Sequence, residues 1–299
     1  MAKTIGVILS ERISAGLVVD HKLVGPVRRF PEDHDDEDAL VEQHTEALVE
    51  TITNQVLLAA DGAKDFTAVG VALPGLVKDG VVAEAPNLPQ LKGAKIQELL
   101  VGQLRNHGLD VSVTAVNDAD GMAAGLASMH GKLDSMIRVW TLGVGIGYGR
   151  YPFAPGAWEG GHSVVTLDEK ERFCGCGGRG HMEGIMGHRA MRLRFLDMEP
   201  EEVFEAAKQG DARCVDFKRL WHKALAAASS TTIHMAGPGK IFISGFNTRF
   251  LDMSMLKDYL AQMVKMSPLQ GYSLEIVEDT PEVRVIGAAV SAEQAAAAR

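Results

Sequence analysis

Short apolar runs alternate with longer stretches of helical spacing along the first part of the chain. β-Branched residues dominate the short runs, which end at Gly, Pro, Asn or Asp and therefore predict strands. Strands are predicted at residues 4–9, 15–20, 23–30, 66–73 and 111–116. Elsewhere apolar residues recur every three or four positions, which is typical of helices. Helices are predicted at residues 39–60, 96–106 and 120–129.

The rest of the chain continues this alternation with one long interruption. A strand predicted at 136–142 runs into the glycine-rich segment 143–149, and residues 151–182 follow neither period. Strands that alternate with helices predict an α/β fold with mainly parallel pairing, and the opening meander of three strands predicts a mixed sheet. The remaining predicted elements are helices at 184–196, 200–209, 212–236, 251–266 and 285–298 and strands at 240–244 and 274–277.

Length and charge narrow the class of protein. A chain of 299 residues exceeds the usual size of one domain, so two are expected, with a boundary near Asn117 where the pattern restarts. The formal net charge of −9 argues against nucleic-acid binding through the overall field, since phosphates would be repelled. No apolar stretch reaches about 18 residues and no signal-peptide pattern opens the chain, so no membrane association is expected.

Cysteine is scarce in this chain, which contains only Cys174, Cys176 and Cys214. Three scattered cysteines cannot build a disulfide scaffold, so the sequence predicts a protein of the reducing cytoplasm. Cys214 lies in a predicted helix and is interpreted as a small core residue. Cys174 and Cys176 are one residue apart among glycines and histidines, and a core position does not explain them.

Four sulfur and nitrogen ligands lie within residues 162–181, namely His162, Cys174, Cys176 and His181. Zinc prefers four such ligands in a tetrahedron, and the intervening glycines allow the tight turns that bring close ligands onto one ion. The sequence therefore predicts a closed structural zinc site, because no water-activating group accompanies a vacant fourth position. The alternative is a glycine-rich loop with unligated surface cysteines, which would be open to oxidation.

Asn117 and Asp118 lie where a predicted strand ends and a helix follows. A carboxylate at such a strand end points into the crevice where α/β proteins bind ligands. Aspartate at a strand end is also a simple turn former, and the residues alone favour that plainer interpretation.

Three segments resemble the signature of the ROK family of repressors, open reading frames and sugar kinases. Residues 159–162 read Glu-x-Gly-His, and residues 174–183 read Cys-x-Cys-Gly-x-x-Gly-His-x-Glu, with His181 in place of the family's third cysteine. Residues 117–120 read Asn-Asp-Ala-Asp, which is similar to the family's Asn-Asp-Ala-Asn. The resemblance implies two actin/hexokinase-like (ribonuclease H-like) α/β domains with a cleft between them.

The resemblance also implies a division of the chain and roles for its residues. Residues 1–117, with the closing helix 285–299 packed on them, would form the first domain, and 118–284 the larger second domain carrying the zinc loop. Asp118 would act as the general base in phosphoryl transfer from ATP, with Mg²⁺, to a sugar hydroxyl. Zinc would hold the loop that presents sugar-binding side chains. The implied sugar ligands are Asn87, Asn117, Asp118, Glu159, His162 and Glu183.

The nucleotide side departs from the family pattern. The family's Asp-x-Gly-Gly-Thr loop corresponds to residues 8–12, which read Ile-Leu-Ser-Glu-Arg and lack the aspartate that acts with Mg²⁺. A second glycine-rich loop persists at 142–149, where Val144 replaces a threonine, although a tight β-hairpin is the plainer interpretation of this run. The implied nucleotide contacts are Gly143, Gly145, Gly147 and Gly245.

Three functions are compatible with these residues. The first is an ATP-dependent hexose kinase of glucokinase type that uses Asp118 as its base. The second is a sugar-binding pseudokinase or regulator, because the loop at 8–12 is replaced. The third is a zinc-stabilised interaction module, which leaves Asn117, Asp118 and Glu183 unexplained. Since the chain begins at its first strand, a self-contained DNA-binding repressor is not expected; a homodimer is common in the family, and the particular hexose is not predicted.

Overall fold

The computed structural model describes residues 3–32, 39–153, 159–265 and 271–297. The chain divides into two compact units. Unit 1 comprises residues 1–137, 149–157 and 280–299, and unit 2 comprises residues 138–148 and 158–279. The boundary expected near residue 117 falls inside unit 1, because the helix that follows it packs on the closing helix of the same unit.

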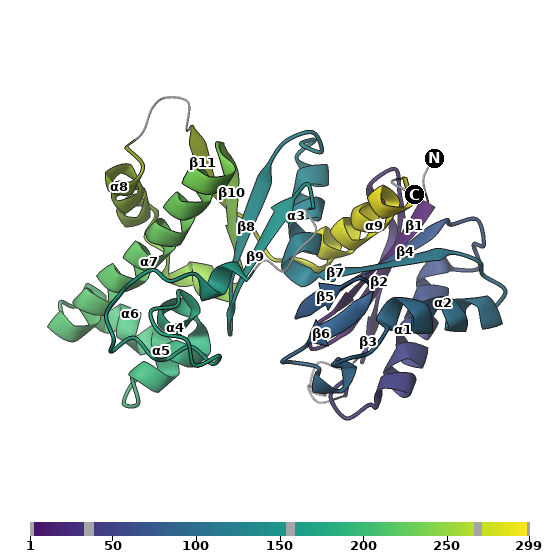
Figure 1. Ribbon diagram of the computed structural model, residues 1–299, viewed down its shortest axis with the longest axis horizontal. Coiled ribbons are helices and arrows are strands. Elements are labelled where there is room, and N and C mark those ends of the chain that lie inside the picture. The colour runs from purple at the N-terminus through teal and green to yellow at the C-terminus, as the bar shows by residue number, and fades with distance from the viewer. Residues whose placement is uncertain (1–2, 33–38, 154–158, 266–270, 298–299) are drawn as a thin grey trace. The chain divides into compact units, whose positions relative to one another are not determined.

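Unit 1 is built on a mixed sheet from the first half of the chain (Figure 1). Its strands are β1 (Lys3–Leu9), β2 (Ile13–Val19), β3 (Lys22–Phe30), β4 (Ala68–Leu73), β5 (Leu76–Lys78), β6 (Val81–Glu84) and β7 (Ser112–Asn117). The sheet order is β3-β2-β1-β4-β7, with β5 and β6 in a separate hairpin. The first three strands pair antiparallel, as the meander predicts, whereas β1, β4 and β7 pair in parallel.

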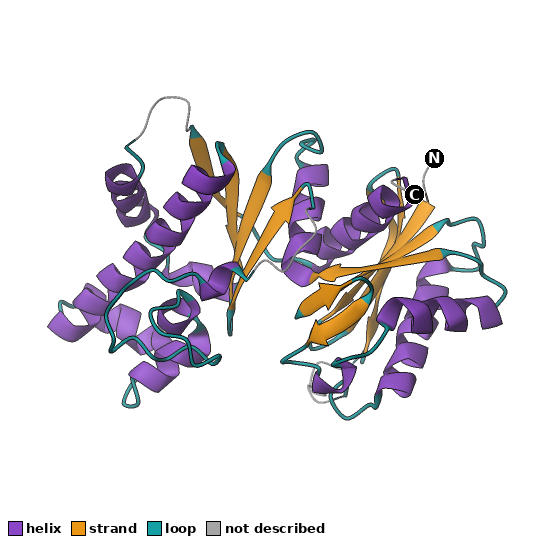
Figure 2. Ribbon diagram, in the orientation of Figure 1, coloured by secondary structure: helices purple, strands orange, loops and turns teal. Residues whose placement is uncertain are grey.

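Helices cover both faces of this sheet (Figure 2). They are α1 (Thr45–Ala60), α2 (Ile96–Asn106), α3 (Asp118–Met129) and α9 (Pro281–Ala297), with the 3-10 turn η1 (Pro89–Leu91). Alternate residues of a strand point to opposite faces of its sheet. Along β1, Ile5 and Val7 enter the core formed with α1 and α2, whereas Gly6 faces α9.

The closing helix α9 approaches α3 at backbone distance, and glycines allow it to do so. A Cβ atom on Gly287 would lie 1.7 Å from the Gly121 carbonyl oxygen, and one on Gly125 would lie 2.0 Å from the Val283 carbonyl oxygen. Any larger residue would force the two helices apart. The relative position of α3 and α9 is therefore set by backbone contact.

We expect Gly287→Ala to lower the free energy of unfolding by about 3 kcal/mol, because its methyl group overlaps backbone atoms that cannot yield separately. The matched control is Gly102→Ala in α2, where an added Cβ meets nothing within 4 Å. There the better helix propensity of alanine predicts a gain of about 0.5–1 kcal/mol. Urea unfolding measures both changes, and equal stabilities of the two variants would contradict the close α3–α9 packing.

Unit 2 carries a second sheet and most of the later helices (Figure 1). Its sheet, in the order β11-β10-β8-β9, consists of β8 (Ile137–Leu142), β9 (Ile146–Tyr151), β10 (Gly239–Ser244) and β11 (Tyr272–Ile276). Its helices are α4 (Glu183–Met186), α5 (His188–Arg194), α6 (Pro200–Lys208), α7 (Ala212–Ala236) and α8 (Met253–Met263), with the 3-10 turns η2 (Gly160–His162) and η3 (Phe246–Phe250). Stacked Phe204 and Phe250 rings, 4.4 Å apart between centroids, lie in its core beside Trp221.

One local prediction needs correction, one hairpin was not predicted, and one local prediction is confirmed. The helix expected at 184–196 is broken at Gly187, whose extended backbone (φ −63°, ψ 139°) ends α4 and precedes α5. The hairpin of β5 and β6 has no predicted counterpart, since strands of three and four residues are too short to show alternation. Cys214 is fully buried on α7, as predicted.

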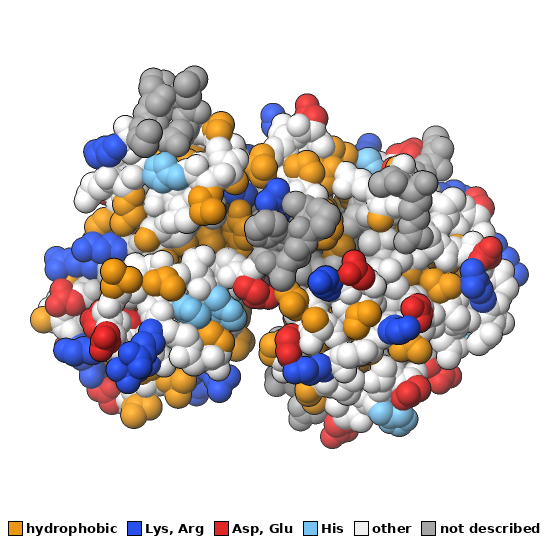
Figure 3. All heavy atoms as spheres, in the orientation of Figure 1, with side chains coloured by type: hydrophobic (Ala, Val, Ile, Leu, Met, Phe, Trp, Pro, Cys, Tyr) orange, Lys and Arg blue, Asp and Glu red, His pale blue; other side chains and the backbone are white. Residues whose placement is uncertain are grey.

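The surface carries charges of both signs. Lys/Arg and Asp/Glu side chains are interspersed over the face drawn in Figure 3, rather than gathered by sign. None of the described helices is both long enough and apolar enough to cross a membrane.

Candidate functional site

The carboxyl end of β7 leads directly into α3, and Asn117 and Asp118 lie at this junction in unit 1. Asn117 caps the helix: its Oδ1 atom accepts a hydrogen bond from the Ala119 N–H at 2.9 Å, and its Nδ2 atom donates to the Gly75 carbonyl oxygen at 2.9 Å. Asp118 occupies the first helical position, where the helix dipole stabilises an anion. The turn predicted from these residues is therefore a helix cap that fixes the Asp118 carboxylate.

Asp118 has a basic partner on the closing helix. The Arg284 Nη1 atom lies 3.3 Å from Asp118 Oδ2, and the side chains are 15% and 27% exposed, respectively. Asp118 Oδ1 accepts a hydrogen bond from the Ala119 N–H at 2.9 Å. Sequence reasoning missed Arg284, since 166 positions separate the pair. The available signal was a cation near the N-terminal end of a helix, a position that the helix dipole disfavours.

Asp120 lies one helical position beyond Ala119 and differs from its neighbour Asp118 in environment. It is buried, and its Oδ1 atom accepts a hydrogen bond from the Arg150 N–H at 3.0 Å. Burial raises the pKa of Asp120 to about 6, and the charge of Asp118 adds to the increase, while the hydrogen bond from Arg150 opposes it. The similar motif of the ROK family has an asparagine at this position. An asparagine side chain would keep an acceptor oxygen for the Arg150 N–H and would not ionise.

We expect Asp120→Asn to stabilise the protein at pH 7.5 by up to about 3 kcal/mol, since each unit of pKa shift corresponds to about 1.4 kcal/mol. The folded-state pKa is raised, so the stability that this carboxyl contributes is present below pH 4 and is lost as the pH rises through 6. The gain of the variant should therefore vanish at pH 4. Urea unfolding at both pH values tests this, with exposed Asp134→Asn as a control expected within about 0.5 kcal/mol.

Asn87, the third predicted sugar ligand of unit 1, lies in an exposed turn between β6 and η1. Asn117 and Asp118 share the junction of β7 and α3, whereas Asn87 lies on a separate segment of the chain. The other predicted sugar ligands, Glu159, His162 and Glu183, belong to unit 2.

Residues 163–182 of unit 2 form a loop closed at its base by backbone hydrogen bonds. The Val165 N–H donates to the Gly180 carbonyl oxygen at 2.8 Å, and the Met182 N–H donates to the Ser163 carbonyl oxygen at 3.0 Å. This closure brings together histidines at the two ends of the loop. The His162 and His181 rings stack with their centroids 5.4 Å apart.

Three of the predicted zinc ligands, His162, Cys174 and Cys176, come together at this loop, and His181 lies beside Cys176. Cys176 Sγ lies 3.3 Å from Cys174 Sγ and 3.2 Å from His181 Nδ1. A ring nitrogen of His162 and the two sulfur atoms lie within 4.8 Å of one another. Zinc–sulfur bonds of about 2.3 Å place tetrahedral sulfur atoms about 3.8 Å apart, so the Cys174 and Cys176 sulfur atoms would have to separate by about 0.5 Å to bind one ion.

Burial shifts the titration of two members of this cluster. It raises the pKa of the Cys174 thiol to about 12. A metal would therefore have to displace the thiol proton, as zinc does when it binds cysteine. Burial, assisted by the charge of His162, lowers the pKa of His181. This favours the neutral imidazole that a metal ligand requires.

Glu183 connects the cysteine–histidine cluster to the glycine-rich turn between β8 and β9. Its Oε2 atom accepts a hydrogen bond from the Ile146 N–H at 3.0 Å. Its Oε1 atom lies 3.7 Å from His162 Nε2 and 3.5 Å from Cys174 Sγ. A Cβ atom at position 145 would lie 2.6 Å from Glu183 Oε2, so a larger residue there would displace the Glu183 carboxylate.

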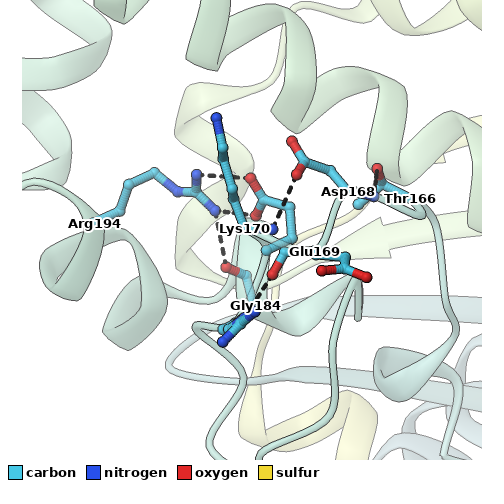
Figure 4. A network of polar contacts seen from close by, with 8 residues as sticks. Thr166, Asp168, Glu169, Lys170, Gly184 and Arg194 are labelled. Carbon is cyan, nitrogen blue, oxygen red and sulfur yellow. Dashed lines mark hydrogen bonds and ion pairs between the residues drawn. The ribbon is translucent and has the colours of Figure 1, made fainter.

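A second anchor holds the loop to α5. Arg194 makes two hydrogen bonds to the Glu171 carboxylate and reaches the Gly184 carbonyl oxygen at 3.5 Å (Figure 4). Its guanidinium also lies 4.4 Å from the Phe173 ring centroid. A mostly buried cation of this kind needs its carboxylate partner, so the loop has a fixed attachment that does not depend on a metal.

The hairpin at residues 8–12 does not offer a metal-binding carboxylate at its first position. Ile8 is buried, and the Arg12 guanidinium donates to the carbonyl oxygens of Pro31 and Glu32, with Arg12 Nε 2.8 Å from the Pro31 oxygen. These residues do not fit Mg²⁺ in the way that an aspartate at position 8 would. The hairpin is instead stabilised by its own side chains.

The predicted nucleotide contacts gather around the other glycine-rich turn. The Gly143 carbonyl oxygen accepts hydrogen bonds from the His188 N–H and from Asn247 Nδ2, both at 3.0 Å. His188 Nδ1 lies 3.2 Å from Asn247 Oδ1, so this histidine braces the turn. Gly245 packs against β8, where an added Cβ would lie 2.5 Å from the Leu142 carbonyl oxygen. Gly145 and Gly147 belong to the turn and to β9, so the run is structurally a hairpin.

Comparison with known proteins extends over most of the chain. A glucokinase of Pyrobaculum calidifontis is 30% identical over 196 residues, which cover 60% of this chain and 63% of that protein. The chain therefore matches less than two thirds of that relative's length. A glucokinase of Thermotoga maritima is 28% identical over 275 residues, or 81% of each chain.

The solved structures show the same fold. A ROK hexokinase from Thermus thermophilus superposes with a TM-score of 0.81 at 20% identity, over 99% of this chain and all of that one. This likeness confirms the predicted actin-like α/β fold. The ROK family model matches residues 34–294. The chain therefore belongs to the ROK family.

Proposed function

We propose that this protein recognises a hexose and transfers a phosphoryl group from ATP to one of its hydroxyl groups. The observation that carries this proposal is the Asp118 carboxylate, fixed at the capped start of α3 beside Arg284. In this reaction the carboxylate takes the hydroxyl proton while the sugar oxygen bonds to the γ-phosphorus and the bond to ADP breaks. The two glucokinase relatives support hexose as the substrate class.

The same proposal assigns the sugar ligands. Carboxylates accept hydrogen bonds from sugar hydroxyls, and amide or imidazole N–H groups donate to them. The proposed ligands that would supply these groups are Asn87, Asn117, Asp118, Glu159, His162 and Glu183. Glu183 would contact the sugar only with the part of its carboxylate that the Ile146 N–H leaves free.

The proposal also includes a structural zinc ion and an ATP molecule. A structural zinc ion would be held by His162, Cys174, Cys176 and His181, and would stiffen the loop that carries His162. ATP would contact the backbone around Gly143, Gly145, Gly147 and Gly245 and would supply the phosphoryl group. Mg²⁺ would accompany the nucleotide without the aspartate that the family has at position 8. The three free cysteines fit a cytoplasmic protein, and a homodimer is the assembly we expect.

One observation favours a second function, hexose binding without phosphoryl transfer. The hairpin at residues 8–12 presents buried Ile8 where kinases of the family have an aspartate, and it holds Arg12 on backbone carbonyls. Loss of a Mg²⁺-organising carboxylate removes transition-state stabilisation without removing sugar ligands. Such a protein would bind the sugar and act as a sensor of its presence, without phosphorylating the sugar.

A coupled assay for ADP release separates the two functions. The full chain is incubated with ATP, Mg²⁺ and each of glucose, mannose, fructose, allose and N-acetylmannosamine, and calorimetry measures the affinity for the same sugars. Turnover with one hexose supports the kinase. Binding of a hexose without ADP release, and without nucleotide binding, supports the sugar-binding function. If no sugar binds and none is phosphorylated, both functions are wrong.

A further inference from the structure

The Arg284 side chain occupies an unusual place for a cation. It lies near the N-terminal end of α9, where the helix dipole disfavours positive charge, so helix stability does not account for it. Its side chain is only 15% exposed, and a cation withdrawn from water requires a nearby anion. Asp118 Oδ2, at 3.3 Å, is that anion.

The backbone around this pair is rigid. Gly121 and Gly125 of α3 contact Gly287 and the Val283 carbonyl of α9 so closely that no Cβ atom fits between the helices. Asn117 caps α3 and ties its start to the Gly75 carbonyl oxygen. Arg284 and Asp118 therefore project from two helices whose separation cannot change freely, and the ion pair is preorganised.

We propose that Arg284 is a positioning residue that holds the Asp118 carboxylate in the orientation needed to accept a hydrogen bond from a sugar hydroxyl. This inference rests on the proposed function and extends it to a residue outside the motifs. Asp118 Oδ1 is oriented by the Ala119 N–H and Oδ2 by Arg284. Each carboxylate oxygen accepts more than one hydrogen bond, so a lone pair remains for the hydroxyl.

The role is one of orientation in both candidate functions. During phosphoryl transfer Asp118 takes the proton and Arg284 stays protonated, because a guanidinium does not act as a base in proteins. In a protein that only binds sugar, the same pair would fix the acceptor for one hydroxyl. Misorientation of a general base should lower kcat more than it changes substrate affinity.

The test compares Arg284→Gln with Arg29→Gln in the full chain. Arg29 is the matched control, because it pairs with Glu282 of the same helix at 3.6 Å and is 40% exposed. We expect Arg284→Gln to lower kcat about 100-fold with the KM for ATP unchanged and the dissociation constant for hexose raised about 10-fold. Arg29→Gln should match the wild type in all three quantities. Arg29→Gln should melt within about 3 °C of the wild type, because its pair is exposed. Arg284→Gln should melt lower, because it leaves Asp118 without this partner, so the kinetic constants and affinities are compared well below both melting temperatures.

Arg284→Lys provides a second variant that keeps the charge while losing the planar fork, so its kcat should fall between those of Arg284→Gln and the wild type. Unchanged kcat and hexose affinity in Arg284→Gln would overturn the proposal. So would an increase confined to the KM for ATP, which would make Arg284 a nucleotide contact. If the wild type binds hexose without turnover, the kinase function fails and the 10-fold change in hexose affinity decides the role of Arg284. If the wild type neither binds nor phosphorylates a hexose, the proposal fails with the function.

Discussion

Asp118→Asn is expected to lower kcat for the preferred hexose by about 10²- to 10⁴-fold, the range that general base catalysis contributes. The amide keeps the size and hydrogen-bonding shape of the side chain but cannot take a proton. It also loses the charge that faces Arg284 at 3.3 Å, so sugar affinity should fall by a smaller factor than kcat. The coupled ADP assay gives kcat, and calorimetry gives the affinity.

Asp110→Asn is the matched control for this substitution. Asp110 also pairs with an arginine, Arg105, at 3.1 Å, but both side chains are exposed. A surface pair of this kind contributes little, so kcat and stability should stay at wild-type values. If Asp118→Asn retained full kcat, Asp118 could not be the base, and the kinase mechanism would have to be assigned to other groups.

Zinc is expected to be present at about one ion per chain, and Cys176→Ser should abolish its binding. Cys176 is the ligand whose sulfur lies near both Cys174 Sγ and His181 Nδ1, so its loss removes the centre of the cluster. The free energy of unfolding should fall by about 3–4 kcal/mol, which corresponds to about 10 °C in the melting temperature. Metal analysis by mass spectrometry and thermal unfolding measure the two effects.

Cys214→Ala controls for the loss of a cysteine as such. Cys214 is buried on α7 and does not belong to the cysteine–histidine group, so this variant should keep its zinc and lose about 1 kcal/mol from the small cavity. Treatment with a zinc chelator should lower the melting temperature of the wild type and leave Cys176→Ser unchanged. Zinc-free wild-type protein with full stability would show that the Glu171–Arg194 attachment alone maintains the loop.

Local patterns were sufficient for most elements of the fold. Strands β1 to β4 and β7 are long enough to show their apolar runs, and the opening meander followed from three strands without a helix. The break at Gly187 could not be predicted, because the helical spacing of apolar residues continues across this extended residue. The boundary of unit 1 was placed too early, because pattern along the chain cannot show that α3 packs on a helix that follows 150 residues later.

The candidate site was predictable where its residues share a short motif. His162, Cys174, Cys176 and His181 lie close in sequence. The loop brings the first three within ligand distance of one another and places His181 beside Cys176. Contacts between distant segments could not be found in this way. Glu183 was expected at a sugar, and its hydrogen bond to the Ile146 N–H depends on how α4 packs on the β8–β9 turn. Arg284 belongs to none of the sequence motifs, and it lies beside Asp118 only in the folded chain.

The place of α9 in unit 1 has a consequence for how the protein is made. The ribosome synthesises β1 to β7 first, whereas the helix that covers one face of their sheet is synthesised only after unit 2. Until residues 281–297 have been synthesised, Gly6 and Gly70 lack their contacts with α9, and that face of the sheet stays exposed. All of unit 2 is synthesised in the meantime. Unit 1 can therefore complete its fold only after the whole of unit 2 has been synthesised.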